Sequence, residues 1–293
     1  MLRTVLTLSF TISLATAFSQ ASPAYKAELD AWHEKRVREL KAENGWLNLA
    51  GLFWLHEGRN SFGSGKNNEL VFPTGKIAEQ AGYFERKGNE VNMVVTADND
   101  VAVDGRPTRA SLIYRPGQTG TVIVSRGSLR WNIIQREDRL GIRLRDLKSA
   151  RLDSFTRIHR FPADSNWRTT ARLETSAIQK TIPITNVLGQ TTQQPSPGKL
   201  VFTLQGKTWS LDALEEGDEL FIIFGDGTNG DETYPSGRFV YAKKPGPDGT
   251  TLLDFNKAYN PPCAFTPFAT CPLPPRQNQL PILVTAGEMT YGH

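Results

Sequence analysis

Turn-forming residues recur at short intervals between residues 46 and 135, and this spacing limits the fold more than any other feature of the chain. Clusters rich in Gly, Asn, Asp and Pro stand at 58–60, 63–65, 67–68, 73–75, 87–89, 98–100, 104–105, 116–117 and 126–127. The runs between them, such as 91–96, 101–103, 121–124 and 129–134, are short and alternating or apolar. Many short strands with closely spaced turns predict an antiparallel sandwich or barrel.

The order of this block resembles the forkhead-associated (FHA) β-sandwich. Residues 58–64 and 67–72 are similar to that family's first recognition loop and its next strand, and residues 101–106 are similar to a later strand and turn. The resemblance covers about 46–135 and implies the same sandwich. It does not imply phosphothreonine binding, because Ser64 stands where the family places its phosphate-holding arginine. The family's Ser-x-x-His is also absent, and Ala81-Gly82-Tyr83 stands near that place.

Flanking segments complete the expected architecture. Residues 24–43 predict a helix, because Tyr25, Leu29, Trp32 and Leu40 recur at spacings near 3.6 and Asn44-Gly45 supplies a stop. A second set of strands is predicted at 178–187, 199–204, 207–211, 219–224, 238–243 and 251–255, with a polar loop at 189–198 and a closing strand at 280–286. The fold class is therefore mainly β: two packed antiparallel β units, an N-terminal helix and an irregular proline-rich C-terminal loop.

The N-terminus has the layout of a secretory signal peptide. A short positive region, Met1-Leu2-Arg3, precedes an apolar run at 4–17 and then small residues. The run is too short for a membrane span, and an N-terminal core helix is the alternative. We expect a signal peptide at 1–21, a helical segment at 22–45, the FHA-like sandwich at 46–137 and a C-terminal β domain at 138–293, with export to the periplasm or the extracellular space.

Both cysteines lie in an irregular stretch, 253–275, that is rich in proline, aromatic and amide side chains. In an oxidising compartment, two cysteines predict one disulfide, here between Cys263 and Cys271. A catalytic thiol or a metal-binding pair is the alternative. The disulfide would hold the loop against the C-terminal sheet, and irregular loops on rigid sheets often carry function.

A longer resemblance covers most of the chain after residue 21. The segments that carry it are 141–146, 224–226 with Thr228, 233–234, 237–239, 254–256 and 260–264. Together they resemble a bacterial family of uncharacterised exported proteins that is known only as a domain of unknown function. The resemblance implies a shared structure and supplies no activity.

The sequence argues against several functional classes. The net charge is +4 and the basic residues are scattered, so no nucleic-acid partner is expected. No zinc spacing, Gly-x-Ser-x-Gly elbow or phosphate loop is present, so we expect no cofactor and no metal. Ser196 and Lys199 have Ser-x-x-Lys spacing, but in a predicted loop and not in a helix.

Two polar groups are candidates for a site. The turn at 226–232 offers oxygen ligands for Ca²⁺, although a hairpin turn explains the same residues. Arg238 and Asp254 are expected to pair and to fix the proline-rich loop, beside amide and aromatic side chains. The candidate ligand-binding residues are Arg145, Asp226, Thr228, Tyr234, Arg238, Asp254, Asn256, Tyr259 and Asn260.

Three functions remain open on the sequence. The first is an exported module that binds a small or polymeric ligand through the C-terminal β domain and its 254–275 loop. The second is a hydrolase that uses the carboxylates of Asp226 and Asp254 with Arg145 or Arg238 stabilising charge. The third is a structural envelope protein in which these residues only brace the fold.

Overall fold

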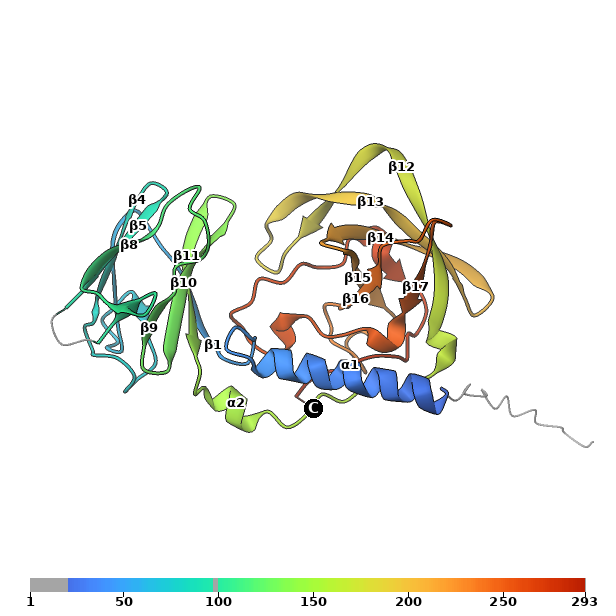
Figure 1. Ribbon diagram of the computed structural model, residues 1–293, viewed down its shortest axis with the longest axis horizontal. Helices are drawn as coiled ribbons and strands as arrows, with labels where there is room; N and C mark the ends of the chain where they lie inside the picture. Colours follow the sequence, from blue (N-terminus) through green and yellow to red (C-terminus); the bar gives the residue numbers. More distant parts are fainter. Residues whose placement is uncertain (1–20, 97–99, 293) are drawn as a thin grey trace, which may run out of the picture.

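The computed structural model describes residues 21–96 and 100–292 of the chain (Figure 1). It confirms a mainly β protein with antiparallel sheets and one N-terminal helix. The expected signal peptide at 1–21 falls almost wholly on residues outside this part. Among the described residues, no helix is both long and apolar enough to cross a membrane.

Helix α1 (Pro23–Lys41) lies along the C-terminal β unit and ends beside the N-terminal one (Figure 1). The Ser22 side chain caps it by accepting a hydrogen bond from the backbone N–H of Tyr25, and proline occupies the start, where its missing N–H costs nothing. Only Tyr25, Leu29 and Leu40 are buried. Polar contacts therefore fix much of this helix on the protein.

The N-terminal unit is a sandwich of two sheets. One sheet has the order β1 (Leu49–Trp54), β11 (Arg139–Asp146), β10 (Leu129–Arg136), β9 (Val124–Arg126), β6 (Ala102–Val103) and β7 (Arg106–Pro107). The other has the order β3 (Leu70–Val71), β2 (Gly58–Gly63), β4 (Gly82–Lys87), β5 (Glu90–Val95) and β8 (Ala110–Tyr114). Phe62, Phe72, Phe84 and Trp131 pack between the sheets and are essentially inaccessible to solvent.

Strand β11 places the end of the sandwich later than the sequence suggested. It pairs with β1 on one side and with β10 on the other, inside the sandwich sheet. The expected boundary between residues 137 and 138 falls in the turn that joins β10 to β11. We therefore place the boundary of the sandwich after Asp146.

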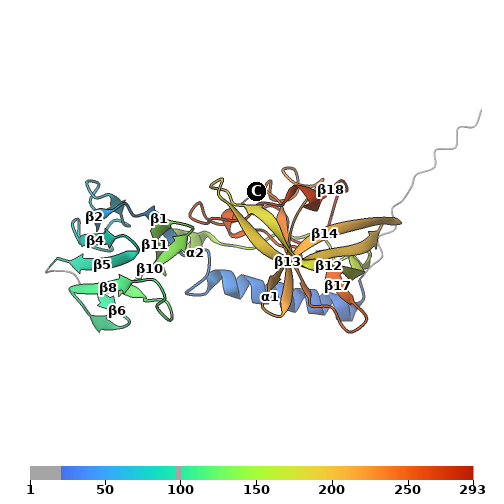
Figure 2. The ribbon, with the colours of Figure 1, turned by 90° about the horizontal axis from the view of Figure 1, so that it is seen from above.

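The C-terminal unit is one strongly curved sheet (Figures 1 and 2). Its order is β16 (Arg238–Lys243), β15 (Glu219–Asp226), β14 (Lys207–Glu216), β13 (Thr191–Leu204), β12 (Arg168–Thr185) and β17 (Thr250–Asp254), with β18 (Gln279–Leu280) parallel to β15. The two outer strands, β16 and β17, follow one another in the chain. The Thr251 hydroxyl donates to the Lys243 carbonyl at 2.8 Å, so the sheet curls until its ends meet.

Short helical turns connect these elements: α2 (Ala150–Ser154) and the 3-10 turns η1 (Ser165–Trp167), η2 (Phe255–Lys257), η3 (Pro262–Ala264) and η4 (Arg276–Asn278). The last three lie in or next to the proline-rich segment, which has no long strand.

Two expected elements are wrong. Most of the predicted polar loop at 189–198 is the first half of β13, and the predicted closing strand at 280–286 is reduced to β18. The first half of β13 alternates exposed and half-buried residues, so it lacks the apolar face that marks a strand in a sequence.

Candidate functional site

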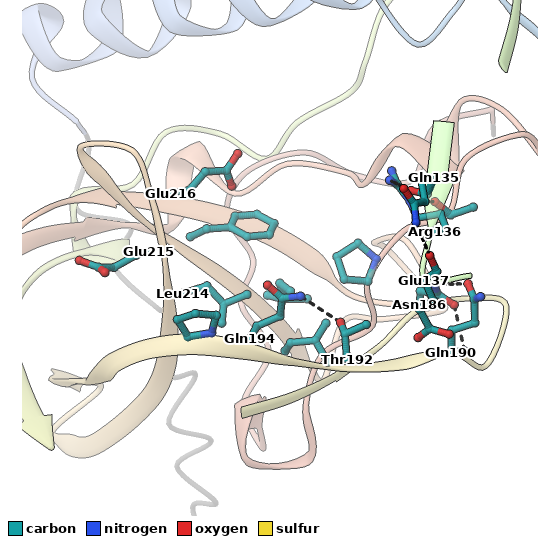
Figure 3. Close-up of a pocket in the computed structure, with 16 residues that line it drawn as sticks. Gln135, Arg136, Glu137, Asn186, Gln190, Thr192, Gln194, Leu214, Glu215 and Glu216 are labelled. Carbon is teal, nitrogen blue, oxygen red and sulfur yellow. Dashed lines mark hydrogen bonds between the residues drawn. The ribbon is translucent and has the colours of Figure 1, made fainter. Parts of the chain in front are cut away.

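A cleft lies between the two β units. Four elements form its walls: the turn between β10 and β11, the outer half of the β12–β13 hairpin, the strands β14 and β15, and the loop that contains both cysteines (Figure 3). One chamber has a volume of about 580 Å³, and an adjoining chamber of about 330 Å³ extends along β16 towards α1. Five residues line both chambers, namely Arg136, Glu216, Phe221, Thr270 and Pro272. We call the two chambers together the inter-unit cleft.

Strand alternation directs arginines to the outer face of the sandwich sheet, beside the cleft. Ile142 and Leu144 of β11 point into the sandwich core, so Arg143 and Arg145 point outward, and Arg145 lies opposite Arg130 of β10. Arg130 donates to Glu43 at 3.1 Å, and Arg145 donates to the carbonyl of Asn44 at 3.1 Å. Two of these three arginines are therefore tied to the chain that follows α1.

Arg143 differs from its neighbours because no acceptor holds it. Within the described residues, it takes part in no ion pair or side-chain hydrogen bond. Its Nε is buried without a partner, as is that of Arg145. Its guanidinium lies 5.6 Å from the centre of the Trp46 ring. Burial, reinforced by the positive charges of Arg136 and Arg145, lowers the pKa of Arg143 to about 10. The group remains charged at neutral pH and lines the smaller chamber.

Aromatic side chains form the floor of the smaller chamber. The rings of Phe221 and Tyr241 stack with centres 5.0 Å apart, and those of Tyr241 and Tyr259 stack at 6.1 Å. The Tyr241 hydroxyl donates to Glu216 at 2.8 Å, and the guanidinium of Arg36 lies 4.5 Å from the centre of the Tyr259 ring. Burial raises the pKa of both tyrosines, so both hydroxyls stay protonated.

The predicted disulfide is present and closes one side of the cleft. Cys263 and Cys271 are bonded, with their Cα atoms 6.1 Å apart. Thr270, Cys271 and Pro272 line the cleft, and Arg136 reaches from the sandwich to the Thr270 hydroxyl at 3.4 Å. The cross-linked loop therefore forms one wall of the cleft and also contacts the sandwich through Arg136.

Most of the candidates from the sequence lie elsewhere, in buried clusters. Asp226 accepts from Arg238 at 2.9 Å and from the N–H and hydroxyl of Thr228, and both members of the ion pair are fully buried. Arg238 also donates to the carbonyls of Val284, Ala286 and Glu288, which fixes the C-terminal segment on the sheet. The expected pair between Arg238 and Asp254 is therefore wrong: Arg238 is bonded to Asp226.

Asp254 and Asn256 belong to a second buried cluster. The Tyr25 hydroxyl lies 2.7 and 2.8 Å from the two carboxylate oxygens of Asp254. The Asn256 amide donates to the same hydroxyl and to the carbonyl of Asp164. This cluster fastens α1 to the end of β17.

The remaining candidates have separate surroundings. Asn260 is fully buried: its N–H donates to Glu288 at 2.7 Å and its amide to the Met289 carbonyl, and Arg36 donates to its carbonyl. Tyr234 lies on the turn after β15, where its carbonyl accepts from Asn229. Of the nine candidates, Tyr259 alone lines the inter-unit cleft.

The turn at 226–232 is built as a hairpin connection. The Asp226 carboxylate accepts hydrogen bonds from Arg238 and Thr228. The Asn229 side-chain oxygen accepts the hydrogen bond of the Asp226 N–H at 2.7 Å. Across residues 21–96 and 100–292, no three His, Cys, Asp or Glu side chains gather in a way that suits a metal ion.

Arg136 and Arg143 are residues that the sequence reasoning did not select. The signal was present in the alternation of 139–146, where Arg143 and Arg145 fall on the face opposite Ile142 and Leu144. The sequence did not reveal which of these arginines would form hydrogen bonds with the segment that follows α1.

Residues 153–289 match the model of a family described as a protein of unknown function (DUF1684). An uncharacterized protein of Haloarcula marismortui, solved by NMR, is 32% identical, covers 48% of this chain and 80% of its own, and gives a TM-score of 0.41.

Two FHA-domain structures are also similar, one of them from a study of phosphothreonine-dependent FHA domain interactions. Each is 14% identical with a TM-score of 0.23, and they cover 32% and 33% of this chain and 92% of their own. No curated protein matches this chain.

Proposed function

Because this chain belongs, through residues 153–289, to a family of proteins of unknown function (DUF1684), we infer its function from the site itself and propose that it binds a small organic anion in the inter-unit cleft. The anionic group pairs with Arg143, and the body of the ligand packs on the aromatic floor. This is the binding-module hypothesis of the sequence, with the site moved from the 254–260 cluster to the cleft.

The observation that carries the proposal is the free guanidinium of Arg143. The buried Nε of this half-buried side chain has no partner, which is costly, whereas a bidentate contact with a carboxylate, phosphate or sulfonate would satisfy it. The volumes of about 580 and 330 Å³ fall in the range of roughly 300–1,000 Å³ that is usual for ligand sites.

The two alternatives have less support. The hydrolase hypothesis needs accessible carboxylates. Asp226 and Asp254 are instead buried and already accept hydrogen bonds from other side chains of the protein. The purely structural hypothesis needs every polar group of the suspected surface to be satisfied, and Arg143 is not.

Calorimetry with benzoate and phenylphosphonate as probes tests the proposal. We expect Arg143→Met to weaken binding by about tenfold or more, the loss of a charge-assisted hydrogen bond of about 1.5–3 kcal/mol, and Arg143→Lys to weaken it less. Arg139→Met is the matched control, since Arg139 belongs to the same strand but lies over Trp54, outside the cleft. Equal binding by wild type and Arg143→Met, or no binding of either probe, would overturn the proposal.

We also propose that the protein acts outside the cytoplasm, as expected from residues 1–21. The support is the Cys263–Cys271 disulfide, since such bonds persist in oxidising compartments. Cell fractionation followed by N-terminal sequencing tests it. Recovery from the periplasm or the medium, with a new N-terminus near residue 22, is expected, and an intact Met1 in the cytoplasm would contradict it.

A further inference from the structure

The inter-unit cleft has two chambers of different chemistry, and the difference identifies a class of ligand. The smaller chamber holds Arg143 and the aromatic floor. The larger chamber adds to apolar and charged residues a group of amide and hydroxyl side chains from the β12–β13 hairpin and the β10–β11 turn, namely Gln135, Asn186, Gln190, Thr192 and Gln194 (Figure 3).

The amides of the hairpin retain hydrogen-bonding capacity towards the cleft. Gln194 donates to the Thr192 hydroxyl at 2.9 Å, and the Gln190 oxygen accepts from Asn186 at 3.0 Å. Within the described residues, the Gln194 oxygen and the Gln190 NH₂ group form no hydrogen bond of their own. One acceptor and one donor therefore remain on neighbouring side chains, and a hydroxyl group satisfies both kinds of partner.

The charges of the cleft favour a ligand with few negative groups. Arg36 and Arg143 line the smaller chamber, Glu137 and Glu215 line the larger one, and Arg136 and Glu216 line both. A polyanion that filled both chambers would meet these carboxylates, and like charges in close contact repel. A neutral body with a single anionic group fits both chambers.

Together these observations deepen the proposed function and depend on it. We propose that the ligand is a short oligosaccharide that carries one carboxylate, such as a chain ending in a uronic acid. The carboxylate pairs with Arg143, the adjacent sugar ring lies against the aromatic floor, and the next rings present their hydroxyls to Gln190 and Gln194.

The test compares matched sugars by calorimetry. The probes are di- and trisaccharides that end in glucuronate or galacturonate, their methyl esters, glucuronate alone and benzoate. We expect at least one uronide disaccharide to bind about tenfold more tightly than glucuronate and than its own ester, because the ester lacks the charge and the monomer cannot reach the hairpin.

Variants of the hairpin assign the second chamber. We expect the double variant Gln194→Leu and Gln190→Leu to weaken binding of the uronide disaccharide by about fivefold or more. Its affinity for benzoate should be unchanged. Gln193→Leu is the matched control: Gln193 is exposed and points to the other face of the same strand. We expect this control variant to fold and to bind the uronide disaccharide as tightly as the wild type does.

The outcomes separate this inference from the function on which it rests. Arg143-dependent binding of benzoate without any preference for the uronide disaccharides or trisaccharides would overturn the sugar and leave the anion site standing. An equal loss in Gln193→Leu would also overturn the role of the larger chamber. No binding of any probe would overturn both proposals.

Discussion

Arg238, which is fully buried, and Arg143, which is half-buried, show two different uses of an arginine in one chain. Arg238 has an acidic partner, Asp226, and three backbone carbonyls, so its charge is compensated inside the fold. Arg143 has an aromatic neighbour and no acceptor among the described residues. The first arrangement stabilises the fold, and the second leaves a charge for a ligand.

This difference predicts the effect of Asp226→Asn. Removing one partner of a buried ion pair leaves an uncompensated charge, which typically costs about 3–5 kcal/mol. We expect that loss in the free energy of unfolding measured by urea denaturation, with unchanged benzoate affinity of the folded protein. The control Asp231→Asn changes an exposed carboxylate of the same turn. Stability equal to wild type in both variants would show that the pair does not brace the fold.

Asp146 predicts a pH dependence. Burial alone would raise the pKa of this carboxyl, but hydrogen bonds from Lys76, Ser128 and the N–H of Lys148 outweigh it and hold the pKa below the ordinary value of 3.8. Because the folded-state pKa is lowered, the stabilisation is complete above pH 3.8 and is lost as the pH falls through the folded-state value.

The variant Asp146→Asn makes this measurable. At pH 7 we expect it to unfold more easily by about 1–3 kcal/mol. The difference from wild type should shrink in unfolding curves taken below pH 4, because the wild-type carboxyl is then protonated as well. A difference that stays constant from pH 7 to pH 3 would contradict the role assigned to its charge.

At the scale of elements, the disulfide is predicted to support both stability and binding. Closing the loop between Cys263 and Cys271 contributes about 2–3 kcal/mol by chain entropy. The double variant Cys263→Ala and Cys271→Ala should lose about this much free energy of unfolding in denaturant curves. It should also bind benzoate more weakly, because Thr270 and Pro272 form part of the wall. Unchanged affinity would mean that the loop does not need the cross-link to shape the cleft.

The elements themselves were largely predictable. The spacing of the turns predicted the short strands of the sandwich. The helical period of the apolar residues predicted α1. The first half of β13 was not predictable, since its residues are half-exposed on one face and exposed on the other and so mimic a polar loop. The disulfide followed from two cysteines and an expected signal peptide.

At the scale of the whole molecule, the candidate site was the least predictable feature. Its walls come from Arg136 and Arg143 of the sandwich, Phe221 and Tyr241 of the curved sheet, and the loop at Cys271. No local pattern in the sequence states that these segments meet. The polar residues that the sequence did suggest are Asp226, Arg238 and Asp254. They form buried hydrogen bonds with other side chains and connect segments of the fold.

One measurement tests the central claim most directly, namely a crystal structure of the protein with 4-iodobenzoate. The iodine atom marks the ligand by its anomalous scattering. We predict that the ligand lies in the inter-unit cleft, with its carboxylate in hydrogen-bonding distance of Arg143 and its ring on the aromatic floor. An iodine site at full occupancy elsewhere, with the cleft filled only by water, would contradict the claim.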